Sequence, residues 1–217
     1  YSPFGHHFNY LSINQHKIWV SNAGVIGSRL YNEDDYNLTF GGFWPGGTNA
    51  YKRFIAENIS FFVAGIVNDS FQLPPFVHLK YLTPGTYNSI PYQNNRVFKI
   101  RNKWESLPYG DIRNNFEKDY NEWPVLSGAP WEDRNSDAIY TPGIDVPKIF
   151  GDEMLWYVSH DAIPISVRLP PLMNDPPFGI EEQVSVFAFN RSNFLQDVVL
   201  LSIKLLNQGS NSINSAR

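Results

Sequence analysis

The apolar segments of this chain are short, and glycine, proline or polar turn residues separate them from one another. The 217 residues include 15 glycines and 16 prolines, the two residue types that most often interrupt helices and strands. The longest apolar candidate, residues 61–67, is far shorter than the roughly 20 residues that a membrane-spanning helix needs. This pattern favours strands joined by turns and predicts no membrane span.

The strand candidates are distributed along the whole chain. Two pairs of strands are expected within residues 8–27 and 51–67, and single strands at residues 96–100, 155–158, 184–190 and 198–206. Residues 28–37 read as a loop, and a proline-rich loop over residues 68–95 holds one further edge strand at residues 76–81. We therefore predict a mainly β fold, an antiparallel β-sandwich with long loops rich in Pro, Gly and Asn.

One segment has the periodicity of a helix. Within residues 110–121, Ile112, Phe116 and Tyr120 recur every four positions, and Pro124 stops the pattern. The sequence thus predicts one short helix and a helix content below about 15%, against the usual 30 to 35%.

Composition excludes several classes of protein. Hydrophobic residues make up 42% of the chain, so it must collapse into a core rather than stay disordered. The net charge of −4 and the lack of a basic stripe argue against nucleic-acid binding. The chain contains no cysteine, which excludes thiol nucleophiles, disulfides and Cys-based metal sites. Without a sharp shift in composition, we expect one domain over residues 1–217, with 208–217 as a frayed tail.

The densest cluster of acidic and amide side chains has the spacing of a calcium loop. Asp133, Asn135 and Asp137 occupy positions 1, 3 and 5 of the pattern Asp-x-Asp/Asn-x-Asp/Asn, so a curled loop turns their oxygens inward. Position 7 is Ile139, which would offer its backbone carbonyl, and Asp145 follows near the place of the closing carboxylate. These five residues are the predicted Ca²⁺ ligands.

Two departures leave an alternative open at this loop. Position 6 is Ala138 where calcium loops of this type have glycine, and no helices are expected on either side. The loop could equally be a hydrated turn built from Asp and Asn side chains. Asp152 is a candidate for a further calcium ligand.

The sequence gives weaker indications of catalysis. Glu153 and Glu181 are candidates for a carboxylate pair, which a glycosidase needs about 5 to 9.5 Å apart, but nothing in the sequence brings them together. His160 reads as an exposed residue at the end of a strand. The tryptophans are expected in the core rather than on a sugar-binding platform: Trp19, Trp104, Trp123 and Trp156.

The last strong strand candidate is apolar on both faces. Two sets of side chains alternate along it: Val198, Leu200, Ser202, Lys204 and Leu206, and Val199, Leu201, Ile203 and Leu205. One face can enter the sandwich core, and the other must be covered. The cover is either a neighbouring subunit, by strand addition or face packing, or a loop of the same chain such as residues 68–95. Contacts that do not close on themselves would build filaments.

Several segments in a fixed order resemble one family. They are residues 18–27, 42–47, 97–100, 120–124, 128–130, 140–145, 151–157 with Asp161, and 186–191. The sequence over residues 13 to 209 resembles the N-terminal region of large secreted proteins of the Bacteroidota and Ignavibacteria type, which often end in a type IX secretion sorting domain. The resemblance implies export and either release or attachment at the cell surface. It also implies that Asp133, Asn135 and Asp137 are equivalent to the family's acidic loop, from which Ala138 departs.

These observations give two hypotheses of function. The first is a secreted extracellular or cell-surface structural or adhesive protein that associates with itself or with other surface proteins and is stabilised by calcium. The second is a carbohydrate-active module that binds or cleaves polysaccharide. The chain starts at Tyr1, and members of the family continue well past the equivalent of Leu206, so we expect a mature product or part of a longer precursor.

Overall fold

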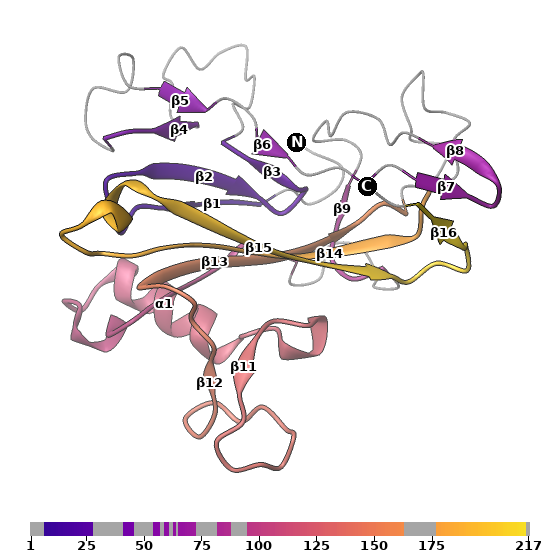
Figure 1. Cartoon of the computed structure of the whole chain (residues 1–217). Coiled ribbons are helices and arrows are strands. Elements are labelled where there is room, and N and C mark those ends of the chain that lie inside the picture. The colour runs from indigo at the N-terminus through magenta and orange to yellow at the C-terminus, as the bar shows by residue number, and fades with distance from the viewer. Residues whose placement is uncertain are drawn as a thin grey trace.

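The structure is a computed structural model and describes residues 7–27, 41–45, 54–56, 59–60, 63, 65–72, 82–87, 95–162 and 177–215. Of these residues, 40% lie in strands and 14% in helices. The sheets are antiparallel and are not closed into a barrel. The chain is therefore a mainly β protein of the sandwich type, as the sequence predicts. Figure 1 shows three layers, with strands β1 to β6 above the long strands β13 to β15 and helix α1 below them.

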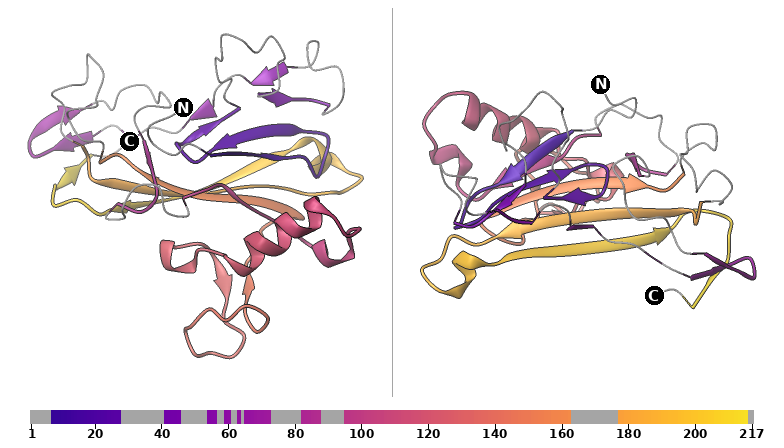
Figure 2. Two further views of the ribbon diagram at one scale, coloured as in Figure 1. Left: turned by 180° about the vertical axis from the view of Figure 1, so that it is seen from behind. Right: turned by 90° about the horizontal axis from the view of Figure 1, so that it is seen from above.

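The middle layer is the central sheet. Its strand order is β10 (Phe98–Arg101), β13 (Glu153–His160), β14 (Ile180–Ala188) and β15 (Val199–Asn207). Strand β9 (Thr83–Pro84) also pairs with the end of β13. The short helical turn η6 (Phe194–Asp197) precedes β15, which lies along one side of the layer in the view from above (Figure 2, right).

The upper sheet packs on one face of the central sheet. Its order is β5-β4-β2-β3-β6, and β1 pairs with β2. The bounds are β1 Phe8–Leu11, β2 Lys17–Ser21, β3 Val25–Ile26, β4 Gly42–Phe43, β5 Phe54–Ala56 and β6 Ile59–Ser60. The core between the two sheets contains Leu11, Ile18, Val20 and Ile26 from above and Leu155, Tyr157, Val184, Val186 and Ala188 from below. Alternation along each strand thus places one apolar face in the sandwich.

A helical and loop layer covers the other face of β10 and β13. It consists of η2 (Trp104–Ser106), α1 (Asp111–Asn121), η3 (Val125–Ser127) and the small hairpin of β11 (Trp131–Glu132) and β12 (Val146–Pro147). A second core forms here among Phe98, Ile100, Trp123, Ala129, Met154, Trp156 and Val158. Because layers cover both of its faces, all eight residues of β13 are buried.

A third, three-stranded sheet involves the C-terminal segment. Strand β16 (Ile213–Asn214) pairs with β7 (Gly65–Val67), which forms a hairpin with β8 (Ser70–Gln72). The prediction that residues 208–217 are a frayed tail is therefore wrong for residues 213–214. The physical reason is that β8 pairs with only one side of β7, so the other side of β7 offers backbone hydrogen-bonding groups to a segment more than 140 positions away.

Most of the expected elements are present. The helix predicted within residues 110–121 is α1, and the segments at 96–100, 155–158, 184–190 and 198–206 correspond to β10, β13, β14 and β15. Ile112 was expected in the buried stripe of the helix but is 71% exposed. The expected strand at 76–81 and the expected loop at 28–37 lie outside the described residues.

Candidate functional site

The acidic loop between β11 and β12 is curled by hydrogen bonds from its backbone to its carboxylates. Asp133 Oδ1 accepts from the amide of Ser136 (2.6 Å) and Oδ2 from that of Ala138 (2.8 Å). Asp137 Oδ1 accepts from the amide of Ile139 (2.7 Å). Ala138 has a φ of 61°, in the left-handed region that favours glycine. Ala138 therefore takes the backbone conformation for which calcium loops use glycine at position 6.

Three of the predicted ligands lie together on the exposed surface of this loop. Asn135 Nδ2 donates to Asp137 Oδ2 (2.8 Å), and Asp137 and Asp133 are both tied to neighbouring amides. Ile139 has an exposed side chain. Within the described ranges no group of three or more His, Asp or Glu side chains is placed to hold a metal ion. Calcium binding by this loop stays a prediction.

The two remaining carboxylates have other partners. Asp145 is fully buried, and its two oxygens accept from the amides of Arg134 (2.9 Å) and Thr141 (2.7 Å). Asp145 thus closes the base of the loop. Asp152 forms an ion pair with Arg191 (2.7 Å) at the start of β13 and also accepts a backbone hydrogen bond from residue 190.

The candidate pair of catalytic carboxylates is not formed. Glu153 lies opposite Ala188 and Glu181 opposite His160, at the two ends of the paired strands. Seven positions along β13 correspond to about 23 Å, far beyond the spacing a glycosidase needs. Of the tryptophans, Trp123 and Trp156 are buried in the core as expected, whereas Trp19 and Trp104 are half-buried.

The end of β13 carries buried polar side chains that the sequence did not reveal. His160 was expected to be exposed, and this is wrong, since only 4% of it is accessible. Its ring packs edge-on against Tyr87 (5.6 Å between ring centroids), and its Nδ1 accepts from the amide of Ala162. Burial lowers the pKa of His160 to about 4. Glu181, the cross-strand neighbour of His160, accepts from the amide of Tyr87 (2.9 Å).

Glu182 points to the opposite face of the sheet, into the sandwich. Its Oε1 accepts from the hydroxyl of Ser159 (2.8 Å). Gly24, at a φ of 82°, closes over this carboxyl, because a Cβ there would lie 2.7 Å from Glu182 Oε1. Burial raises the pKa of Glu182 to about 7, although the Ser159 hydrogen bond acts in the other direction.

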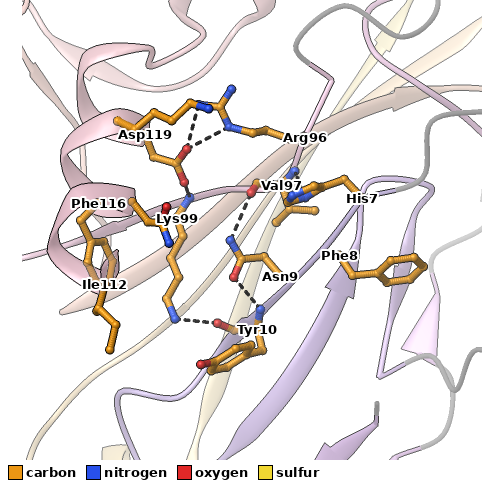
Figure 3. Close-up of a pocket in the computed structure, with 12 residues that line it drawn as sticks. His7, Phe8, Asn9, Tyr10, Arg96, Val97, Lys99, Ile112, Phe116 and Asp119 are labelled. Carbon is orange, nitrogen blue, oxygen red and sulfur yellow. Dashed lines mark hydrogen bonds and ion pairs between the residues drawn. The ribbon is translucent and has the colours of Figure 1, made fainter. Parts of the chain in front are cut away.

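A cavity of about 340 Å³ lies between β1, β10 and helix α1. Figure 3 shows Ile112 and Phe116 of α1 on one side and His7 and Phe8 on the other, with Lys99 between them. None of these residues carried a functional motif in the sequence.

Two ion-pair groups hold the walls of this pocket. Arg96 Nη2 contacts both Asp119 (2.8 Å) and Glu122 (2.8 Å), and Asp119 also accepts from the amide of Lys99 (2.7 Å). The Lys99 ammonium donates to the carbonyl of Tyr10 (2.8 Å) and lies 3.2 Å from Glu153. Burial lowers the pKa of Lys99, an effect that Glu153 partly offsets. Burial raises the pKa of Asp119, because it disfavours the charged form of a carboxyl group just as it disfavours that of an ammonium group.

His7 contributes a neutral imidazole to the same pocket. Its Nδ1 accepts from the amide of Val97 (3.1 Å), so the proton of the neutral ring is on Nε2. Burial, and secondly the charge of Arg96, lower the pKa of His7. The sequence held one usable signal for this site: Asp119 lies three residues after the buried Phe116 and hence on the same face of the helix.

Strand β15 forms an edge of the central sheet. Within the described part of the chain it pairs with β14 alone. Three of its leucines keep large exposed fractions: Leu200 37%, Leu201 42% and Leu205 41%. Val199 and Ile203 pack against the sandwich core.

No family model, curated protein or solved structure matches this chain. The resemblance to secreted proteins stays a prediction. Among the described residues, no helix combines the length and apolar character needed to cross a membrane.

Proposed function

We propose that the chain is an extracellular or cell-surface structural module that joins a second copy of itself along the free edge of β15. The observation that carries this proposal is a nine-residue strand with three exposed leucines that pairs with β14 alone among the described residues. Such an edge is a template for another strand. The extracellular location rests on the resemblance described above.

Backbone geometry identifies the groups that the edge offers. The amide of Asp161 donates to the carbonyl of Ile180, so even-numbered residues of β14 bond to β13 and odd-numbered ones to β15. Since Glu181 lies opposite Leu206, even-numbered residues of β15 bond to β14. The amide of Gln208, which donates to the carbonyl of Gly179, fits the same alternation. The groups on the outer edge therefore belong to the odd-numbered residues: Val199, Leu201, Ile203, Leu205 and Asn207.

The side chains of this edge are self-complementary. Antiparallel pairing of two copies about a two-fold axis at Ile203 places Leu201 opposite Leu205 and Leu200 opposite Leu206. Ser202 then lies opposite Lys204, so the two ammonium groups avoid direct opposition. An axis at Ser202 would instead place Leu200 opposite Lys204, and an axis at Lys204 would place Leu206 opposite Ser202. This pairing satisfies the reciprocity that a two-fold interface requires.

The proposed contact closes on itself. Two copies joined in this way share one continuous central sheet, and neither copy keeps a free β15 edge. We therefore propose a dimer rather than the open filament that a head-to-tail contact would build. Stabilisation of the acidic loop by calcium belongs to the same proposal, and the curled backbone at Ala138 supports it.

Light scattering after size-exclusion chromatography tests the proposal. At micromolar concentration the wild-type protein is expected at twice the monomer mass, and Leu201→Lys at the monomer mass. Ile144→Lys is the matched control, because Ile144 is 48% exposed in the loop between β11 and β12, which points away from the central sheet (Figure 1). A monomeric wild-type protein would overturn the proposal, as would a dimer that Leu201→Lys leaves intact.

A further inference from the structure

Among the described residues, the pocket between β1, β10 and α1 has hydrogen-bond donors without a partner. The side chains of Asn115 and Lys118 line it and form no hydrogen bond or ion pair with other described residues. His7 adds an Nε2–H on the facing wall, because its Nδ1 is engaged by Val97. A ligand that accepts hydrogen bonds, and in particular an anion beside Lys118, fits these groups.

The acceptors of the pocket are largely engaged. Asp119 receives Arg96 on Oδ1 and the amide of Lys99 on Oδ2. The amide oxygen of Asn9 accepts from the amide of Tyr10, and its Nδ2 donates to the carbonyl of Val97. A polyhydroxylated ligand such as a sugar needs both donors and acceptors, so the lining disfavours it.

The remaining walls are apolar and aromatic. Phe116 is buried beneath the helix, and Ile112, 71% exposed, forms an apolar lip. Tyr10 presents its ring to the ammonium of Lys99, 4.5 Å from the ring centroid. The volume of about 340 Å³ is at the lower end of the range of about 300 to 1,000 Å³ for small-molecule pockets.

We propose that this pocket binds a small carboxylate that carries an apolar ring, a compound of the benzoate class. The ring contacts Phe116 and Ile112, and the carboxylate accepts hydrogen bonds from the side chains of Lys118, Asn115 and His7. This binding site is independent of the β15 edge, so it goes beyond the proposed assembly role.

Titration of the isotopically labelled protein with benzoate, followed by amide chemical shifts, tests the site. Three comparison ligands separate the chemistry: benzamide keeps the ring without the charge, acetate keeps the charge without the ring, and galacturonate adds hydroxyls. Benzoate is expected to shift amides of α1 and β1 and to bind about tenfold more tightly than each of the others.

Two exposed positions test the contacts without disturbing the core. Lys118→Gln is expected to weaken benzoate about tenfold, while Lys148→Gln, the same change on an exposed lysine outside the pocket, leaves the affinity unchanged. Ile112→Ser should weaken benzoate but not acetate. The proposal is overturned if benzoate causes no shifts at about 10 mM, if benzamide or galacturonate binds equally well, or if Lys118→Gln and Lys148→Gln have the same effect.

Discussion

Strands β13 and β15 belong to the same sheet and have similar apolar sequences, yet all residues of β13 are buried while most of β15 is exposed. The difference comes from position in the sheet. Strand β13 has β10 and β14 on its two sides and a packed layer on each face. Strand β15 has β14 on one side alone among the described strands. Apolar content thus identifies a strand, but neighbours decide whether it stabilises the fold or is free to bind.

The largest expected effect contrasts one substitution in the two strands. Leu155→Ala removes a fully buried side chain from the sandwich core and should lower the free energy of unfolding by about 2 to 5 kcal/mol. Leu201→Ala, at a 42% exposed leucine of β15, should cost less than about 1 kcal/mol. Urea denaturation of both variants at low protein concentration measures the difference. Equal losses of unfolding free energy in the two variants would contradict the assigned difference in burial between β13 and β15.

Proline substitutions test which backbone groups of β15 point outward. Ser202→Pro removes an amide that bonds to β14 and leaves a β14 carbonyl without its donor, which should destabilise the monomer by about 1 to 3 kcal/mol. Leu201→Pro removes an outward-facing amide, so the fold should lose much less while the dimer dissociates. Thermal melting and light scattering on the same two samples give both readouts. If Ser202→Pro is more stable than Leu201→Pro, then the odd-numbered residues of β15, and not the even-numbered ones, bond to β14.

The central strands also carry buried titratable groups, whereas the charged side chain of β15 is the exposed Lys204. Burial raises the pKa of Glu182 to about 7, so the folded protein holds this proton more tightly than the unfolded chain. The free energy of unfolding should therefore fall as pH rises from about 4.5 to about 7, by up to about 3 kcal/mol. Glu182→Gln should remove this slope. The measurement is the difference in unfolding free energy between variant and wild type at several pH values.

His160 should give the opposite slope at the same end of the strand pair. Burial lowers its pKa to about 4, so the unfolded chain takes up this proton first. Stability should then be lost as pH falls from about 6.5 to about 4, again by up to about 3 kcal/mol. His160→Asn, which keeps an acceptor for the amide of Ala162, should remove the loss. For each variant, the difference in unfolding free energy from wild type is measured at several pH values. If these differences change with pH in the same direction for His160→Asn and Glu182→Gln, the assignment is refuted.

Local patterns predicted the elements well because their causes are local. The spacing of Phe116 and Tyr120 and the stop at Pro124 define α1 within a few residues, and it begins and ends close to the expected bounds. Burial at strand ends has distant causes. His160 is covered by Tyr87, and the strand β9 that pairs beside it lies more than 70 residues earlier. No window around His160 contains that information.

The pocket was missed for the same reason. Arg96 and Lys99 come from β10 and the residues before it, Asp119 from the helix and Glu153 from the next long strand. Arg96, Lys99 and Asp119 each read alone as an ordinary surface charge, and Glu153 was predicted only as one member of a carboxylate pair with Glu181. The sheet register at β10 and β13, which sets Arg101 opposite Glu153, is what brings these groups together.

The smallest expected effect tests burial against exposure within the acidic loop. Asp137 is exposed, whereas Asp145 is buried with both oxygens bonded to loop amides. A loop of the affinity found in extracellular calcium modules should add about 1 kcal/mol to stability in a few millimolar calcium. Excess chelator should accordingly lower the melting temperature of the wild type slightly. The Asp137→Ala variant should have the same melting temperature with and without calcium. The Asp145→Ala variant should have a lower melting temperature than the wild type in both conditions, because the substitution leaves the amides of Arg134 and Thr141 without acceptors. Identical wild-type melting curves in calcium and in chelator would show that hydrogen bonds alone hold this loop.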